Sequence, residues 1–371
     1  MSKVRDSNFE LLRVISMFWI VLFHVILYIG EIPNKGVSII LEFIQLMIVI
    51  HVNLFVLITG YFQSKSTFKQ SRIWSLVNAT MFYKIIIVII LTCLGIINLN
   101  SLELFNDLSI FNIDQYWFIR TYIYLYILSP FINKFIESLD KKSYLNLLII
   151  LFCLFSIIPF ITANRGFSNN GFTLYNFIYI YLIGAYIKKY PLDKSNILKK
   201  CSKKSLQIIL FSLFIICPLL NFLLTYASQY LIGINSITDD IFSNFYLMRY
   251  DYSHPIVIIQ SISFFLLFSL INFKSKIINN VSKLTLGIYL IHENRFIREP
   301  LYKITGISDG VADSYSFILY VIIISLIIFV TCGFIEKIRQ ILFKFIYNRN
   351  LSFKIRKKYY NWISAIKINS T

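Results

Sequence analysis

Charged residues are scarce in this chain of 371 residues. They make up only 15% of it, and the 18 acidic residues are outnumbered by 36 Lys and Arg. Hydrophobic residues account for 57%, and the mean hydropathy is +0.69. A composition so poor in charge lies far outside the range of soluble proteins. It excludes an ordinary soluble globular domain.

Cysteine is also rare. The five cysteines lie mostly in apolar segments and show no paired spacing, so we expect small packing residues rather than disulfide partners or metal ligands. The sequence shows no zinc motif, no nucleotide-binding loop, no dinucleotide motif and no internal repeat. We therefore predict neither a bound metal nor a permanently bound cofactor. The cysteines are Cys93, Cys153, Cys201, Cys217 and Cys332.

The sequence contains many long hydrophobic runs. Most reach the roughly 20 residues that a helix needs to cross a bilayer. They predict an all-α integral membrane protein with a bundle of about ten transmembrane helices. The first run lacks a convincing cleavage site, so we expect no cleavable signal peptide. The runs cover residues 10–29, 38–62, 75–97, 115–136, 143–162, 174–187, 206–224, 254–272, 284–300 and 315–335.

The basic residues are unevenly distributed among the connections between these runs. With a cytoplasmic N-terminus, most Lys and Arg lie on the cytoplasmic side, which predicts an even number of spans with both termini cytoplasmic. The net charge of +18 then indicates contact with anionic membrane lipids and not with nucleic acid, for which no recognition fold is present. We divide the chain into a transmembrane domain, 1–336, and a basic cytoplasmic tail, 337–371. The opposite side has Lys35, Arg165, Arg249, Arg295, Arg298 and Lys303.

Arg13 and His24 are two ionisable residues within the first hydrophobic run. Eleven steps along a helix return to nearly the same face, with the two groups about 16 Å apart along the axis. Ionisable groups in a spanning helix cost free energy and are therefore functional candidates. The alternative is that Arg13 extends to lipid phosphates while His24 is a packing residue.

Four segments, in order along residues 8–300, carry a family resemblance. The first is Glu-Leu-Leu-Arg13, ten residues and His24; the second is Asn53-Leu-Phe-Val-Leu-Ile-Thr-Gly-Tyr61-Phe, with Thr59 where Ser is usual. The third runs from Tyr116-Trp117-Phe to Pro130, and the fourth is Leu286-Gly-Ile-Tyr-Leu-Ile-His292-Glu-Asn294. Together they resemble the membrane-bound acyltransferase-3 family, which includes surface-polysaccharide O-acetyltransferases.

The resemblance implies a transferase of the bacterial cell (plasma) membrane, with residues 1–336 as its acyltransferase domain. It would carry out O-acetylation, or another O-acylation, of a cell-surface or lipid-linked glycan of the cell envelope. The donor substrate would be cytosolic acyl-CoA, with acetyl-CoA expected. Other envelope-polysaccharide proteins would be partners beside the membrane lipids. The sequence leaves open the acceptor, its hydroxyl, the acyl chain and the oligomeric state.

The resemblance also implies roles for four residues, with His24 and Arg13 as the catalytic residues. Arg13, together with Lys69 and Arg72 in the second cytoplasmic loop, would bind the phosphates of acyl-CoA; the family usually has Arg at the last two positions. Ordinary positive-inside charge is the alternative for Lys69 and Arg72. His24 would either deprotonate the acceptor hydroxyl or carry the acyl group itself.

A second polar cluster is expected toward the external leaflet, where it would form a glycan-binding mouth. The alternative for Arg120, Glu293 and Arg295 is that they form ion pairs between helices. His51 could hydrogen-bond near His24 or have a packing role. The predicted substrate-binding residues are Tyr61, Trp117, Arg120, His292, Glu293 and Asn294.

Two other function classes remain open at this point. One is a polysaccharide exporter or flippase-like transporter, and the other is a glycan polymerase. A transporter would need a path lined by Arg13 but no titrating His24. Acylation by the purified protein distinguishes these classes from the acyltransferase.

Overall fold

The computed structural model describes residues 6–98, 100, 116–162, 169–192, 202–231, 243 and 245–348. Within these ranges the regular elements are all helices, and an isolated bridge joins Glu31 to Val311. The predicted all-α class is therefore confirmed for the described part of the chain.

In the described part of the chain, six helical segments are long and apolar enough to cross a membrane. The chain is accordingly a multi-pass membrane protein. These segments are α1 (Ser7–Leu27), α2 (Lys35–Ile48) with α3 (His51–Gln63), α4 (Gln70–Cys93), α7 (Lys141–Phe152) with a π-helical turn (Cys153–Ile157) and α8 (Ile158–Thr162), α11 (Lys203–Leu231), and α17 (Ser316–Asn348).

The remaining predicted runs also contain helices, but these are shorter or more polar. The count of about ten spans therefore stays a prediction. The helices are α6 (Trp117–Ser138), α9 (Leu174–Lys189), α13 (Pro255–Ser269), and α15 (Thr285–His292) followed by α16 (Arg295–Ile304). The short helix α14 (Lys276–Val281) and a 3-10 turn (Ser282–Leu284) precede α15.

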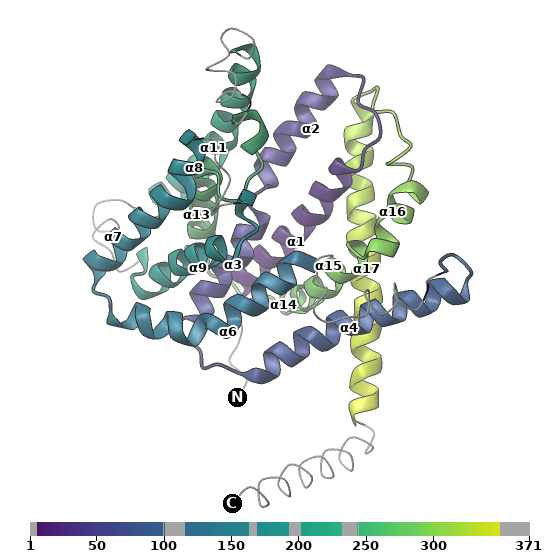
Figure 1. Ribbon diagram of the computed structural model, residues 1–371, viewed down its shortest axis with the longest axis horizontal. Coiled ribbons are helices and arrows are strands. Elements are labelled where there is room, and N and C mark those ends of the chain that lie inside the picture. Colours follow the sequence, from purple (N-terminus) through teal and green to yellow (C-terminus); the bar gives the residue numbers. More distant parts are fainter. Residues whose placement is uncertain are drawn as a thin grey trace, which may run out of the picture.

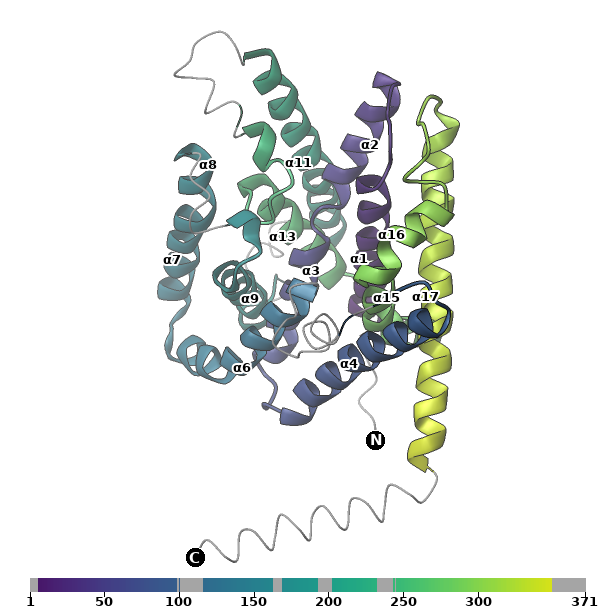
Figure 2. The ribbon, with the colours of Figure 1, turned by 45° about the vertical axis from the view of Figure 1, so that its right-hand side comes forward.

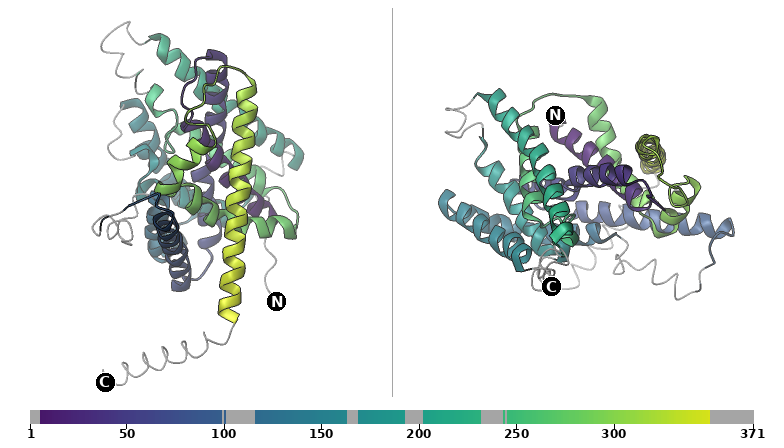
Figure 3. Two further views of the ribbon diagram at one scale, coloured as in Figure 1. Left: turned by 90° about the vertical axis from the view of Figure 1, so that its right-hand side faces the viewer. Right: turned by 90° about the horizontal axis from the view of Figure 1, so that it is seen from above.

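Helix α1 runs through the interior of the bundle, where it contacts α2, α3, α13, α15 and α17. Figures 1 and 2 show α17 along one side of the molecule and α7, α8 and α11 on the other. Helices α4 and α6 run obliquely across the end at which α1 begins and α17 ends. In the left view of Figure 3, α17 spans the full height of the bundle.

Two of the predicted runs are interrupted in the structure. The run 38–62 breaks between Ile48 and His51, where α2 gives way to α3. The run 284–300 breaks after eight helical residues at His292, and Asn294 caps the next helix by accepting a hydrogen bond from the Phe296 backbone N–H. Such breaks bring polar backbone and side chains into the interior of the bundle.

Helix α17 continues through the predicted domain boundary at residue 336 and reaches Asn348. Lys337, Arg339 and Lys344, at the start of the predicted tail, therefore lie in the same helix as the end of the predicted transmembrane domain. The rest of the predicted tail, residues 349–371, lies outside the described residues.

Helices α3 and α9 approach each other backbone to backbone. A Cβ atom on Gly60 would lie 2.1 Å from the Tyr181 carbonyl oxygen, and one on Gly184 would lie 2.3 Å from the Leu57 carbonyl oxygen. Small residues permit this approach, which is a common way for helices to associate in a membrane. The contact holds the end of α3, including Tyr61, against α9.

Candidate active site

A cavity of about 310 Å³ lies between α1, α3, α4, α6 and α15. Arg13 and His24 both line it, as their eleven-residue spacing predicts for one face of a helix. Most of the wall is apolar or aromatic, so its few polar groups act in a partly dry environment. The other lining residues are Met17, Ile20, His51, Val52, Phe55, Thr59, Leu76, Trp117, Phe118, Ile119, Tyr122, Tyr252, Thr285, Leu286, Tyr289 and Glu293.

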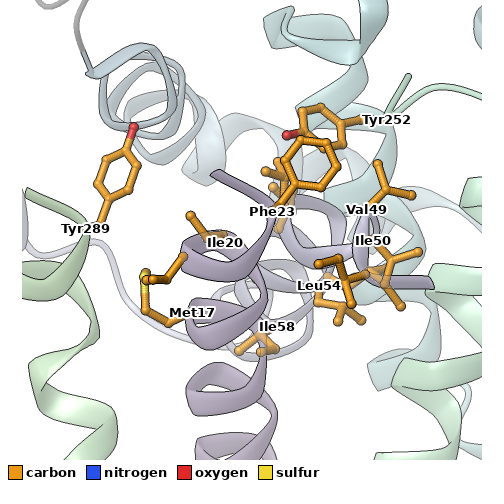
Figure 4. Close-up of a cluster of buried hydrophobic side chains, with 14 of the residues drawn as sticks. Met17, Ile20, Phe23, Val49, Ile50, Leu54, Ile58, Tyr252 and Tyr289 are labelled. Carbon is orange, nitrogen blue, oxygen red and sulfur yellow. The ribbon is translucent and has the colours of Figure 1, made fainter. Parts of the chain in front are cut away.

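Hydrophobic packing holds α1 on both sides of this wall. Figure 4 shows Met17 and Ile20 on the side of α1 toward Tyr289, and Phe23 on the other side with Leu54. All five side chains belong to one buried cluster or pack against it, and Leu54 is fully buried. The rotation of α1, and with it the direction of its polar face, is therefore set by packing.

The imidazole of His24 lies beside two further polar side chains. Its Nδ1 atom is 3.0 Å from Glu293 Oε1 and 3.3 Å from His292 Nε2. The second ring nitrogen of His292, Nδ1, lies 2.6 Å from the Ile288 carbonyl oxygen. A carbonyl only accepts, so His292 carries its proton on Nδ1 and can accept at Nε2.

This network selects one tautomer of His24. The Glu293 carboxylate and His292 Nε2 are both acceptors, so His24 Nδ1 must be the donor. The other nitrogen of His24, Nε2, then carries a lone pair. That is the form that either a general base or a nucleophile requires.

The turn between α15 and α16 positions Glu293. Asn294 Nδ2 donates to the Tyr116 hydroxyl at 3.1 Å, and that hydroxyl donates to the Leu290 carbonyl at 2.7 Å. Both contacts tie the turn to the start of α6. The contacts of Asn294 therefore hold in place the turn that carries Glu293.

Arg298 is a charged neighbour that the sequence reasoning did not select. Its Nη1 atom lies 3.6 Å from Glu293 Oε2. A guanidinium beside the carboxylate favours its charged form, which is the better acceptor for His24. In the sequence, nothing distinguishes Arg298 from other cations near loops. Only the turn at residue 293 places its side chain near Glu293.

Arg13 is held by a carboxylate of its own helix. Arg13 Nη1 donates to Glu10 Oε1 at 2.6 Å, and the Ser282 hydroxyl donates to Glu10 Oε2 at 2.5 Å. Ser282 lies just before α15, the helix that leads to His292. Glu10 therefore fixes the Arg13 guanidinium and links the two helices that carry the site.

The structure brings together residues that the sequence analysis assigned to separate clusters. His24 was expected in the membrane interior and His292 and Glu293 at an external mouth, but the three are in direct contact. The reason is that α15 begins beside Glu10, where the Ser282 hydroxyl contacts that carboxylate, and packs along α1 up to His292. Trp117, predicted for the acceptor, also lines the cavity.

Other predicted residues lie away from this cavity. Arg72 lines a neighbouring cavity of about 250 Å³, which shares Leu76, Tyr122 and Leu286 with the first. Arg72 Nη1 donates to Gln63 Oε1 at 2.7 Å. Among the residues that line the His24 cavity we find none of Tyr61, Lys69, Arg72 and Arg120.

Lys69 and His51 have contacts of other kinds. The backbone N–H of Lys69 donates to the Tyr126 hydroxyl at 3.0 Å, and its side chain is exposed. His51 lines the cavity, but its ring nitrogens contact the Ile48 carbonyl at 2.7 Å and the Tyr252 hydroxyl at 3.3 Å.

His24, His292 and Glu293 could also hold a metal ion, since one ligand atom from each lies within 4.8 Å of the others. Such an ion would use the lone pair of His24 Nδ1 and leave the proton on Nε2. Metal binding and the base form of His24 are therefore mutually exclusive uses of the same three side chains.

The fold defines the class of protein, a multi-pass membrane protein whose helical bundle encloses a cavity with a few polar side chains. The sequence model of the family described as "Acyltransferase domain" matches residues 6–337. The chain belongs to this family, the acyltransferase-3 family, and is an acyltransferase. No curated protein and no solved structure matches it.

Proposed function

We propose that the enzyme is an O-acyltransferase that moves an acyl group, acetyl in the leading case, from cytosolic acyl-CoA to a glycan hydroxyl. The acceptor is a cell-surface or lipid-linked glycan at the bacterial plasma membrane. One observation carries the proposal: His24 Nδ1 lies 3.0 Å from Glu293 Oε1 at the wall of a cavity that Arg13 also lines. A histidine oriented by a carboxylate is a common general base in acyl transfer.

In the proposed reaction, His24 Nε2 takes the proton of the acceptor hydroxyl. The hydroxyl oxygen bonds to the thioester carbon, the carbon–sulfur bond breaks, and the proton passes to the departing sulfur. His292 Nε2 accepts from Nδ1–H, and the nearby Glu293 carboxylate stabilises the imidazolium that forms. Transient acylation of His24 is the alternative route, and it requires the same tautomer.

The donor is proposed to approach from the cytoplasmic end. Arg13 lies about 16 Å from His24 along the axis of α1, which is comparable with an extended pantetheine arm. Arg72 lies in the neighbouring cavity with shared walls, so phosphates held there would be close to the same path. Lys69, whose side chain is exposed, is proposed to add charge beside Arg72.

The acceptor is proposed to reach His24 along the wall that holds Trp117. Its indole is in contact with Phe172 and stacks on Tyr252 with ring centres 6.0 Å apart, so the wall is aromatic. Such surfaces bind the apolar faces of sugars. Tyr61, Arg120 and Asn294 stay predictions as acceptor contacts.

The proposed topology has about ten spans and two cytoplasmic termini. The basic residues that follow the bundle would then meet anionic lipids of the inner leaflet. Other envelope-polysaccharide proteins are proposed as further partners, because they would supply or extend the glycan.

Replacement of His24 tests the reaction. In purified protein supplied with acyl-CoA and glycan, His24→Gln should lower the acylation rate by about 10²- to 10⁴-fold, because the proton acceptor is lost. Mass spectrometry of the glycan measures the product. His254→Gln is the matched control: His254 is buried at the start of α13 but does not line the cavity, so activity should persist.

The same assay separates the outcomes. Wild-type acylation by His24→Gln, present at normal abundance in the membrane, would contradict the proposed mechanism. Activity should also survive a chelator, because a metal on His24 Nδ1 would leave the wrong tautomer.

A further inference from the structure

A second, polar cavity of about 480 Å³ lies at the ends of α3, α9, α11 and α13. Four lysines line it, and the described lining residues include no Asp or Glu. We call this cavity the lysine pocket. Its lysines are Lys65, Lys188, Lys189 and Lys203.

The lysines come from three separate segments of the chain. Lys188 and Lys189 lie in the last turn of α9, where cations meet the negative end of a helix. That effect does not account for Lys65, between α3 and α4, or for Lys203, the first residue of α11. Like charges gathered around one cavity repel each other, and a bound anion would offset this cost.

The start of α11 adds to the positive potential. This helix has 29 residues, and its first residue, Lys203, lines the lysine pocket. Helix N-termini carry positive partial charge and bind phosphate groups readily. Two independent features, the lysine side chains and a helix N-terminus, therefore favour an anion at the same place.

Aromatic and backbone contacts hold two of the lysines in position. Lys188 Nζ lies 4.3 Å from the centre of the Tyr61 ring. Lys189 Nζ donates to the Ile136 and Leu139 carbonyls, at 2.7 and 2.8 Å. Lys189 therefore braces the end of α6, while the cation–π contact keeps Lys188 at the pocket wall.

The lysine pocket adjoins the Arg13 end of the catalytic cavity. The Phe62 ring is near a cation of each cavity, with Arg13 Cζ 5.9 Å and Lys188 Nζ 5.8 Å from its centre. Tyr61 packs against Phe62 and lines the lysine pocket. Tyr61, predicted from the sequence as a substrate contact, thus belongs to the wall of this second cavity.

We infer that the lysine pocket binds a phosphate-bearing group. Lysine ammonium groups bind phosphate as point charges, and the volume is sufficient for a nucleotide or a lipid headgroup. Two sources share this chemistry, the nucleotide end of coenzyme A and the headgroup of an anionic phospholipid. The inference does not depend on the acyl-transfer mechanism.

The test measures binding to the full-length protein in phosphatidylcholine nanodiscs. In one arm adenosine 3′,5′-bisphosphate is titrated; in the other, phosphatidylglycerol is added to the nanodisc and its retention is measured by native mass spectrometry. Lys188→Gln and Lys203→Gln should each weaken binding about fivefold in one of the arms. The arm that responds identifies the source.

Lys204→Gln is the matched control, because Lys204 is the next residue of α11, is exposed and does not line the pocket. It should bind both probes like the wild type. Equal binding of both probes by wild type, Lys188→Gln and Lys203→Gln would overturn the inference, as would an equal loss in Lys204→Gln. His24→Gln should retain binding, so failure of the catalytic proposal is measured separately.

Discussion

At the scale of single residues, the position of one proton governs the proposed chemistry. His292 Nε2 accepts from His24 Nδ1, Glu293 Oε1 lies 3.0 Å from the same nitrogen, and Nε2 is left as the reactive atom. The sequence analysis predicted Glu293 as an acceptor contact at an external mouth. Because Glu293 lies 3.0 Å from His24 Nδ1, we propose a positioning role for it, and Glu10 contacts Arg13 in a similar way.

Glu293→Gln tests this role. An amide can turn its NH₂ group toward His24 Nδ1 and favour the opposite tautomer, so kcat should fall by about 10²-fold or more with little change in acceptor KM. Steady-state kinetics with varied acceptor measure both. Glu299→Gln, at an exposed position of α16, should leave both unchanged. A change in acceptor KM alone would assign Glu293 to the acceptor, as the sequence predicted.

At the scale of helices, buried polar contacts connect α4, α15 and α17. Glu336 of α17 accepts from the Tyr83 hydroxyl of α4 at 2.6 Å and from Arg339 at 2.7 Å. A Cβ on Gly287 of α15 would lie 2.3 Å from Glu336 Oε2. The absence of a side chain at Gly287 therefore lets α15 lie against α17, and α15 carries His292 to the site.

The contact between α3 and α9 allows a prediction at the same scale. Gly184→Ala should lower the free energy of unfolding by about 1–3 kcal/mol, because the added methyl group collides with the Leu57 carbonyl. Thermal unfolding in detergent measures the change. Gly333→Ala is the control, since its nearest contact, Ile288, is at 3.5 Å. Equal stability of the Gly184→Ala and Gly333→Ala proteins would contradict the close packing.

At the scale of the whole molecule, orientation in the membrane is the open question. The start of α1 and the end of α17 lie toward the same end of the bundle in Figures 1 and 2. The lysine pocket combines ends of α3, α9 and α13 with the start of α11. The basic residues of the lysine pocket favour a cytoplasmic location for this end of the bundle.

Cysteine labelling of intact cells tests the orientation, in a background without the five native cysteines. Asn169→Cys should react with a membrane-impermeant reagent from outside, whereas Lys142→Cys and Lys276→Cys should react only after permeabilisation. Asp240, which we expect outside, and Lys200, which we expect in the cytoplasm, lie outside the described residues. External labelling of Lys142→Cys would reverse or reject the proposed topology.

Local sequence determined much of this protein. Hydropathy alone predicted the helical membrane class, because a bilayer requires long apolar helices whatever their neighbours. The spacing of Arg13 and His24 predicted a shared face, because helical periodicity is local.

The tertiary structure alone decided how the site is assembled. His24 and His292 are 268 positions apart, and their contact depends on how α15 packs against α1. The grouping of Lys65, Lys188 and Lys203 around one pocket likewise depends on how helices pack side by side. Periodicity predicts which residues share one face of a helix. Only packing determines which neighbouring helix that face contacts.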